Sequence, residues 1–125
     1  LTAATDGITL GAAMAGYFHA RVAYAKKSKE TAVEDFIESR QRLASGIELT
    51  YYLPGRAISR GENVLIVDDL IRSGETQELL LDIAKQANAD VTGVFALISV
   101  GDEGIERARE LTDAPVGALT TFDAE

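Results

Sequence analysis

The chain has 125 residues, 46% of them hydrophobic and 26% charged, which is enough for one compact domain and too little for two. It has no cysteine, which excludes a disulfide framework and a thiolate metal site and fits a reducing cytoplasm. The formal charge of −8 opposes a broad nucleic-acid-binding surface, and many acids with few lysines suggest a salt-adapted, halophilic protein. Its apolar stretches are too short or too interrupted to span a bilayer.

The N-terminal half predicts a helix, a strand, a second helix and a second strand. Ile8–Phe18 combines small and apolar residues near helical spacing, and Arg21–Ala25 is a short strand candidate. Thr31–Glu34 has the form of a capping box, and the apolar residues after it predict an amphipathic helix. Ile47–Leu53 alternates apolar and polar residues, which predicts a half-exposed strand that the following Pro-Gly pair ends.

The C-terminal half predicts a regular alternation of strands and helices. Val64–Val67 is apolar throughout, as in a central parallel strand that is covered on both faces. A helix with an apolar stripe from Leu80 to Ala87 follows, and then a buried strand at Val91–Val100. A polar helix near Ile105–Leu111 and a short strand near Val116–Thr120 complete the pattern. Residues 1–125 therefore predict one α/β domain with a central parallel sheet flanked by helices.

The informative segment is V-L-I-V-D-D-L-I-R-S-G-E-T, residues 64–76. A buried strand ends in Asp68 and Asp69, and a Ser-Gly-Glu-Thr loop then opens a helix. Ligands bind at the carboxyl ends of parallel strands, and a helix N-terminus offers free N–H groups to an anion. Two carboxylates repel phosphate and suit ribose hydroxyls or a divalent metal, so the pattern predicts a ribose 5-phosphate clamp. The alternative is a capped strand–helix turn whose acids face solvent.

This segment resembles the phosphoribosyl pyrophosphate (PRPP) motif of type I phosphoribosyltransferases: an apolar strand, two acids, two apolar residues, one variable residue and Ser/Thr-Gly-x-Thr. Val22–Lys29 is similar to the strand before the mobile flap loop of adenine and xanthine phosphoribosyltransferases, and Gly46–Ile58 to the strand pair after it. Thr5–Gly7, entering a helix, stands where the family keeps its pyrophosphate loop. The resemblance implies the type I fold, with the family's first strand and N-terminal hood upstream of Leu1.

The resemblance also implies roles for single residues. Asp68 and Asp69 are expected to bind the ribose, and Lys27 to stabilise the charge of the leaving pyrophosphate. The residues expected at the 5′-phosphate are Arg72, Ser73, Gly74, Glu75 and Thr76. The residues expected at the pyrophosphate are Thr5, Asp6, Gly7, Lys26 and Lys27. Asp6 departs from the pattern, because an acid repels pyrophosphate unless Mg²⁺ lies between them.

Ser28–Ser45 is expected to be the mobile flap, because a lid protects an oxocarbenium-like state from water. Its Lys29, Arg40 and Arg42 could reach the pyrophosphate when it closes. The alternative is an ordinary amphipathic helix, with a solvated face or packed on a second subunit. His19, the one histidine, is expected at the surface end of a helix and not in catalysis.

The activity that the resemblance implies is transfer of phosphoribosyl from PRPP to a purine base, giving a nucleoside 5′-monophosphate and pyrophosphate. Mg²⁺ would be bound through PRPP or pyrophosphate, and the family usually forms homodimers. Arg72 stands where hypoxanthine–guanine enzymes carry an acid, which favours adenine or xanthine, yet Val100–Gly104 replaces the aromatic platform of those enzymes. The alternative is a noncatalytic, PRPP-sensing transcriptional regulator with a DNA-binding domain upstream, for which Asp6 also speaks.

Overall fold

The computed structural model describes residues 1–123. Its elements in chain order are β1 (Thr2–Ala3), α1 (Gly7–Phe18), β2 (Tyr24–Ala25), β3 (Phe36–Arg42), β4 (Glu48–Pro54), β5 (Asn63–Ile71), α2 (Glu75–Gln86), β6 (Asp90–Val100), α3 (Glu103–Leu111) and β7 (Val116–Phe122). The parallel strands β5, β6 and β7 form one sheet in that order, with α2 and α3 as the connections. The expected α/β fold with a parallel sheet is confirmed.

Backbone hydrogen bonds connect the short N-terminal strands to this sheet. β1 pairs in parallel with β2, and Leu1 joins β1 to β5 through bonds of 2.8 Å to Leu65 O and 2.9 Å from Val67 N. Lys26 and Tyr52 exchange two further bonds, of 2.9 and 2.7 Å, which attach β4 next to β2. The hydrogen-bonded backbone is thus continuous from β4 to β7, and β1, β2 and β5 end at the same edge.

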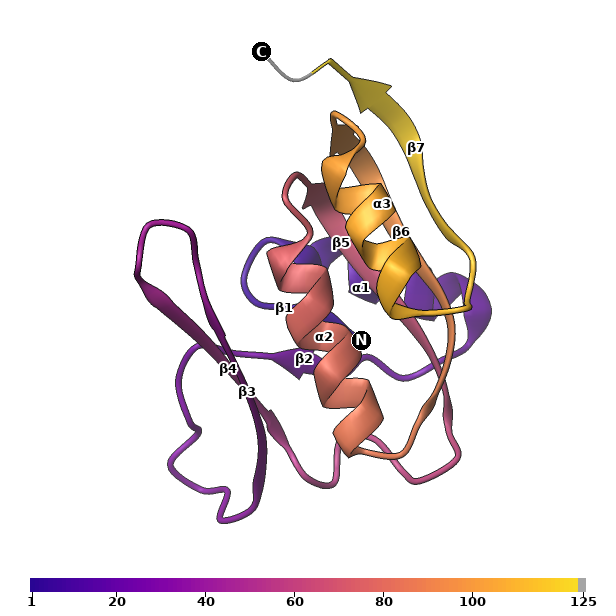
Figure 1. The fold of residues 1–125 in the computed structure, drawn as a ribbon. Helices are drawn as coiled ribbons and strands as arrows, with labels where there is room; N and C mark the ends of the chain where they lie inside the picture. The colour runs from indigo at the N-terminus through magenta and orange to yellow at the C-terminus, as the bar shows by residue number, and fades with distance from the viewer. Residues whose placement is uncertain (124–125) are drawn as a thin grey trace.

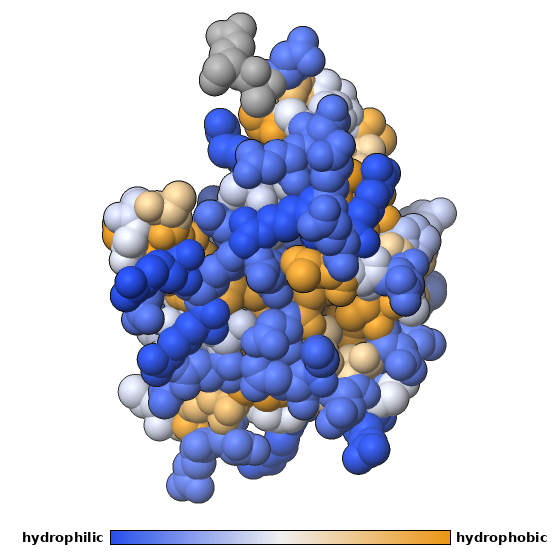
Figure 2. Space-filling view, in the orientation of Figure 1, coloured by the Kyte–Doolittle hydropathy of each residue, from blue (hydrophilic) through white to orange (hydrophobic). Residues whose placement is uncertain are grey.

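The core lies where α2 and α3 cover one face of the sheet. Ile66, Leu80 and Ile83 are fully buried there. In Figure 1, α2 and α3 lie in front of β5 and β6, and α1 lies behind them. The outer surface of α2 and α3 is mostly hydrophilic, with apolar residues showing between the helices (Figure 2). Coverage from both sides explains why the strand at Val64–Val67 shows no polar alternation.

Helix α1 rests on the sheet through two glycines that lie one turn apart. Gly7 and Gly11 are its buried residues. A Cβ on Gly7 would lie 2.0 Å from Thr2 Oγ1 and 3.2 Å from Asp68 Oδ1, and one on Gly11 would lie 3.3 Å from Thr2 Cγ2. Only glycine permits this approach, which brings the first turn of α1 beside the end of β5.

The first strand was expected upstream of Leu1, and the structure corrects this expectation. β1, at Thr2–Ala3, lies before the loop at Thr5–Gly7 and within the chain. A strand of two residues is too short to show alternation of apolar and polar residues in the sequence.

Residues 36–42 form a strand, so the helix predicted after Thr31–Glu34 is wrong. This strand, β3, pairs antiparallel with β4. Two polar side chains of β3 face α2: Ser39 Oγ donates to Asp82 Oδ2 at 2.6 Å, and Gln41 Nε2 donates to Glu78 Oε2 at 2.9 Å. Because the inward face of β3 is polar, its period-2 pattern is hidden, and the capping-box match misled the prediction.

Candidate functional site

A cleft of about 670 Å³ opens where β1, β2 and β5 end. Its sides are residues 3–8, residues 26–28 (the lysine wall) and residues 68–76 (the acidic wall), of which 68–70 and 76 line the cleft. The predicted site residues that line it are Thr5, Asp6, Gly7, Lys26, Lys27, Asp68, Asp69 and Thr76. Those in the adjoining loop, beside the cleft and not on its lining, are Arg72, Ser73, Gly74 and Glu75. The neighbouring parallel strands cause this convergence, since the loops after them meet at one edge.

Asp68 is held in place at the base of the acidic wall. It is 8% exposed, and its Oδ1 accepts a hydrogen bond of 2.8 Å from the backbone N–H of Asp69. Its Oδ2 accepts a bond of 3.3 Å from Nε2 of Gln77. Burial raises the pKa of Asp68 to about 7, and the adjacent Asp69 and Asp6 add to this rise. A ligand that needs an ionised Asp68 must therefore displace its proton near neutral pH.

The loop before α2 presents backbone N–H groups at the end of the acidic wall. Gly74 is the N-cap of α2 and has a φ of +84°, a left-handed conformation that favours glycine. No side chain among the described residues caps this helix end. The N–H groups of its first turn are therefore available to an anion, and the helix dipole favours negative charge there.

Helix α3 packs directly against this loop and fixes its shape. A Cβ on Gly104 would lie 2.7 Å from Arg72 O and 3.0 Å from Gly74 N, so only glycine fits there. Arg107 pairs with Glu78 of α2 and also donates to Ser73 O at 3.4 Å. The sequence prediction was that Val100–Gly104 replaces the aromatic platform for the base. The structure adds that Gly104 supports the loop before α2.

The lysine wall faces the acidic wall across the cleft. Lys27 is exposed, lines the cleft and makes no ion pair within residues 1–123. Lys26 pairs with Glu30 at 2.9 Å, and this hydrogen bond raises the pKa of Lys26. Lys29 instead lies over two aromatic rings, 5.9 Å from the centre of Phe36 and 5.2 Å from that of Tyr52. Of the three lysines, Lys27 is the one free to meet a ligand.

The remaining candidates lie outside the cleft. Arg40 and Arg42 are on β3, and Arg40 pairs with Glu38 at 2.7 Å. Neither arginine lines the cleft. His19 is exposed at the C-cap of α1, as expected.

Sequence reasoning missed two buried residues of the site. Tyr51 of β4 is 5% exposed and lines the cleft, and burial, helped by the charge of Asp68, raises its pKa. Gln77 of α2 is 3% exposed and donates to Asp68. The signal for Gln77 was present, because it falls on the apolar stripe of Leu80 and Ala84, where a polar side chain needs a buried partner.

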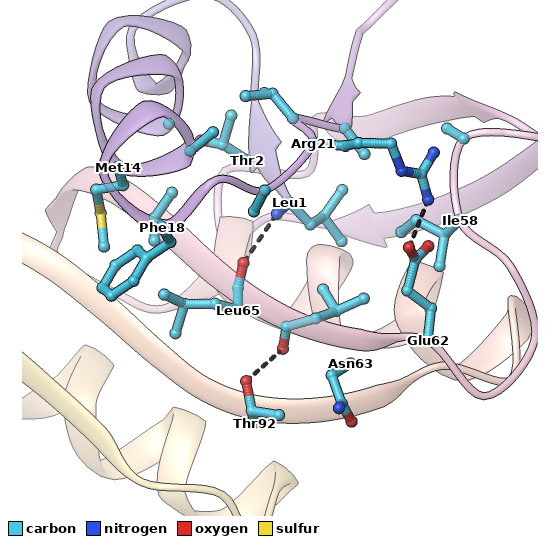
Figure 3. A pocket seen from close by; sticks show the side chains of 18 of the residues that line it. Leu1, Thr2, Met14, Phe18, Arg21, Ile58, Glu62, Asn63, Leu65 and Thr92 are labelled. Carbon is cyan, nitrogen blue, oxygen red and sulfur yellow. Dashed lines mark hydrogen bonds and ion pairs between the residues drawn. The ribbon is translucent and has the colours of Figure 1, made fainter.

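A second cavity, of about 470 Å³, lies between α1 and the sheet (Figure 3). Met14, Phe18 and Leu65 line it with apolar atoms, and the paired Arg21 and Glu62 lie at one side. The residues predicted for ribose, phosphate and pyrophosphate all lie elsewhere. This cavity is therefore distinct from the candidate site.

None of the helices within residues 1–123 has the length and apolar character that crossing a membrane requires. The same residues contain no group of three or more His, Asp or Glu side chains placed to hold a metal ion.

The sequence is similar to phosphoribosyltransferases and to a regulator. It is 33% identical over 125 residues to a xanthine phosphoribosyltransferase of Alkaliphilus metalliredigens, covering 98% of this chain and 62% of that protein. It is 29% identical over 121 residues to the purine biosynthesis transcriptional repressor PurR of Bacillus subtilis, covering 96% of this chain and 41% of the repressor. The chain thus spans less than two thirds of the length of these relatives. No family model matches it.

Solved structures share the fold. The crystal structure of adenine phosphoribosyltransferase from Rhodothermus marinus superposes with a TM-score of 0.84 at 24% identity. The match covers 97% of this chain and 67% of that one. In sequence, the chain is therefore similar to xanthine and adenine phosphoribosyltransferases, and it has the type I phosphoribosyltransferase fold.

Proposed function

We propose that residues 1–125 form one PRPP-binding domain of an enzyme that transfers phosphoribosyl to a purine base, giving a nucleoside 5′-monophosphate and pyrophosphate. The observation that carries this proposal is the meeting of two carboxylates, an uncapped helix N-terminus and a free lysine around one cleft. Each of these groups matches one part of PRPP: the ribose, the 5′-phosphate and the pyrophosphate. Purine salvage is the metabolic role that such a reaction serves.

The acidic wall supports the ribose and 5′-phosphate assignments. Asp68 and Asp69 offer carboxylate oxygens that accept hydrogen bonds from ribose hydroxyls. The phosphate lies at the first turn of α2, where the N–H groups from Ser73 to Thr76 and two hydroxyls can donate to it. Arg72 and Glu75 contribute their backbone N–H groups in this arrangement.

The lysine wall and the loop at Thr5–Gly7 support the pyrophosphate assignment. Lys27 stabilises the charge that develops on pyrophosphate as the C1′–O bond breaks, with Lys26 as a second cation. Thr5–Gly7 leads into α1, whose N-terminal end attracts negative charge. Both groups therefore act on the leaving group and not on the ribose phosphate.

Magnesium enters this proposal with the substrate. Mg²⁺ prefers oxygen ligands and keeps several waters, so it would be bound through the oxygens of PRPP or pyrophosphate. When bound, the ion neutralises the pyrophosphate charge. An ion lying between Asp6 and the pyrophosphate would also offset the repulsion between this carboxylate and the leaving group.

Xanthine and adenine are the bases that we propose to try first. Arg72 is exposed, and its guanidinium offers only hydrogen-bond donors, so it cannot accept a purine proton as a carboxylate at this position would. The sequence likeness to a xanthine phosphoribosyltransferase gives xanthine the first place. A homodimer and a salt-adapted, cytoplasmic protein belong to the same proposal, and rest on the family resemblance and the charge of −8.

The test is a turnover assay on the full-length protein with PRPP and Mg²⁺. Xanthine, adenine, hypoxanthine and guanine are each offered at low and at molar salt, because an acidic, salt-adapted protein can unfold in dilute buffer. We expect at least one nucleoside monophosphate to form with release of pyrophosphate. Absence of turnover with all four purines, orotate and uracil, alongside tight PRPP binding, contradicts the enzyme.

That result favours a second function, PRPP sensing by a regulator. The observation that supports it is the likeness to the repressor PurR, which covers 96% of this chain. A regulator needs the acidic wall to bind PRPP and does not need Lys27 for turnover. DNA binding that changes with PRPP, measured on the full-length protein, distinguishes it from the enzyme.

A further inference from the structure

Gln77 is a buried polar residue on a helix face that is otherwise apolar. It lies in the first turn of α2, on the stripe that continues with Leu80 and Ala84, and it is 3% exposed. Burying an amide costs free energy unless its polar atoms find partners. The partner of its Nε2 is Oδ2 of Asp68, at 3.3 Å. The side chain that breaks the apolar stripe therefore contacts one of the two acids of the cleft.

Two protein groups donate hydrogen bonds to Asp68, one to each oxygen of its carboxylate. Oδ1 accepts from the N–H of Asp69, and Oδ2 accepts from Gln77. Each carboxylate oxygen has two lone pairs, so one on each oxygen stays open to a ligand. Rotation about the last carboxylate torsion is otherwise broad. With a donor on each oxygen, this rotation is restricted, and the open lone pairs keep a constant direction.

Gln77 is also the neutral donor among charged neighbours of Asp68. The groups that share the cleft are Asp69 on the same strand, Asp6 before α1, Tyr51 on β4, and Lys26 and Lys27 after β2. The acids and the burial oppose ionisation of Asp68, and its raised pKa follows from them. A hydrogen bond donated to the carboxylate favours the ionised form. The hydrogen bond from Gln77 thus favours ionisation of Asp68, whereas the burial and the neighbouring acids oppose it.

We propose that Gln77 is a positioning residue of the phosphoribosyl site: its amide turns the Asp68 carboxylate to accept a ribose hydroxyl and favours the ionised form of that carboxylate. The inference rests on the proposed function of the cleft. It adds a residue that acts through Asp68 and that lies outside the two acids and the phosphate loop.

The test compares two Gln→Leu variants of the same helix. Q77L removes the donor and keeps a similar volume. Q86L is the matched control, because Gln86 is exposed near the other end of α2 and bonds to Glu38 O and Asp82. PRPP affinity is measured by calorimetry with Mg²⁺ from pH 6 to 9. We expect Q77L to bind PRPP about tenfold more weakly at pH 7, the effect of losing a hydrogen bond to a charged group. The pH midpoint of binding should rise by about half a unit or more in Q77L and stay constant in Q86L.

A merely structural role predicts a different result. Affinity of Q77L that is unchanged, or that falls by one factor at every pH without a shift of the midpoint, overturns the proposal. If Q77L does not fold, Q77E serves instead: it is nearly isosteric, and its deficit in PRPP affinity relative to the wild type at the same pH should lessen as the pH falls and the introduced carboxyl gains a proton to donate. If the wild-type protein binds no PRPP, the proposed function fails, but the role of Gln77 can still be decided by carboxyl NMR of the ligand-free protein. A higher pKa of Asp68 in Q77L than in Q86L supports the proposed role of Gln77. Equal pKa values in the two variants overturn that role.

Discussion

The two walls of the cleft differ in how firmly they are built. The acidic wall consists of the end of a buried strand and the start of a helix. Backbone and side-chain contacts hold Asp68, Gly74 and the supporting Gly104 in place. The lysine wall follows a two-residue strand and is held by the exposed pair of Lys26 and Glu30, and by Lys29 over aromatic rings. Exposed pairs of this kind contribute little to stability. The difference matches the two parts of the proposed substrate, because the ribose phosphate stays bound through the reaction whereas the pyrophosphate must leave.

The largest effect should come from removing both acids of the acidic wall. In the double variant D68N/D69N we expect PRPP binding to weaken by at least about 2 kcal/mol, since charge-assisted hydrogen bonds to the ribose are lost. Calorimetry with Mg²⁺ measures the change, and circular dichroism checks that the variant is folded. Unchanged affinity in the folded double variant removes the ribose clamp from the proposal.

Filling the contact between α3 and the phosphate loop should test how rigid the acidic wall is. Gly104→Ala places a Cβ against Arg72 O and Ile71, so we expect the free energy of unfolding to fall by about 1 to 3 kcal/mol. Gly16→Ala is the control, because a Cβ there meets no atom within 4 Å, and alanine in a helix is favourable by up to about 1 kcal/mol. Denaturant unfolding of both variants gives the comparison. A Gly104→Ala protein as stable as the wild type means that this loop yields easily.

The raised pKa of Asp68 gives a stability change of definite sign. Between about pH 4, where a free carboxyl ionises, and about pH 7, the folded ligand-free protein binds more protons than the unfolded chain. Its free energy of unfolding should therefore fall as the pH rises through this window. D68N should remove this loss and be more stable than the wild type at pH 8 by on the order of 1 kcal/mol, a value reduced for solvent screening at the cleft.

Denaturant unfolding of the wild type and D68N at pH 5 and pH 8 measures this effect. PRPP binding should change in the opposite direction and strengthen above pH 7, because the ligand needs the ionised carboxylate. If the free energy of unfolding depends on pH equally in the two proteins, the pKa of Asp68 is not raised by folding. The acidic wall would then differ less from the lysine wall in the burial of its charged groups.

The effect of the lysine wall should appear in turnover. We expect Lys27→Ala to lower kcat by about tenfold and nucleotide binding by less than about threefold, because Lys27 faces the leaving pyrophosphate. Lys29→Ala is the control, since Lys29 lies over aromatic rings away from the cleft. Steady-state kinetics on both variants gives the split. Equal losses in kcat and in nucleotide affinity would place Lys27 at the ribose phosphate instead.

The acidic wall could be predicted from the sequence, because its signals are local. Strand β5, the two acids and the loop before α2 follow one another without a break, so spacing alone orders them. β3 could not be predicted, since its polar inward residues Ser39 and Gln41 are explained only by carboxylates of α2, roughly 40 residues away along the chain. Lys26 and Lys27 are neighbours in the sequence, and the structure distinguishes them: Lys26 pairs with Glu30 and bonds to Tyr52 through its backbone, whereas Lys27 is exposed. From the sequence, Lys27 could be preferred to Lys26 only by resemblance to the family. In the structure, Lys27 is preferred because its ammonium group has no ion-pair partner among the described residues.

The contact of Gly7 with Thr2 and Asp68 also limits how this protein can evolve. Three segments from different parts of the chain meet there, and a Cβ on Gly7 would lie 2.0 Å from the hydroxyl of Thr2. Asp68 is needed to bind the ligand, so it cannot be replaced to make room for a larger residue at position 7. Such a residue therefore requires a smaller side chain than threonine at position 2 in the same lineage. The two N-terminal positions should thus vary as a pair across descendants, while the aspartate beside them stays constant. A regulator and an enzyme descended from the same ancestor would share this coupling, since both must keep the ribose in place.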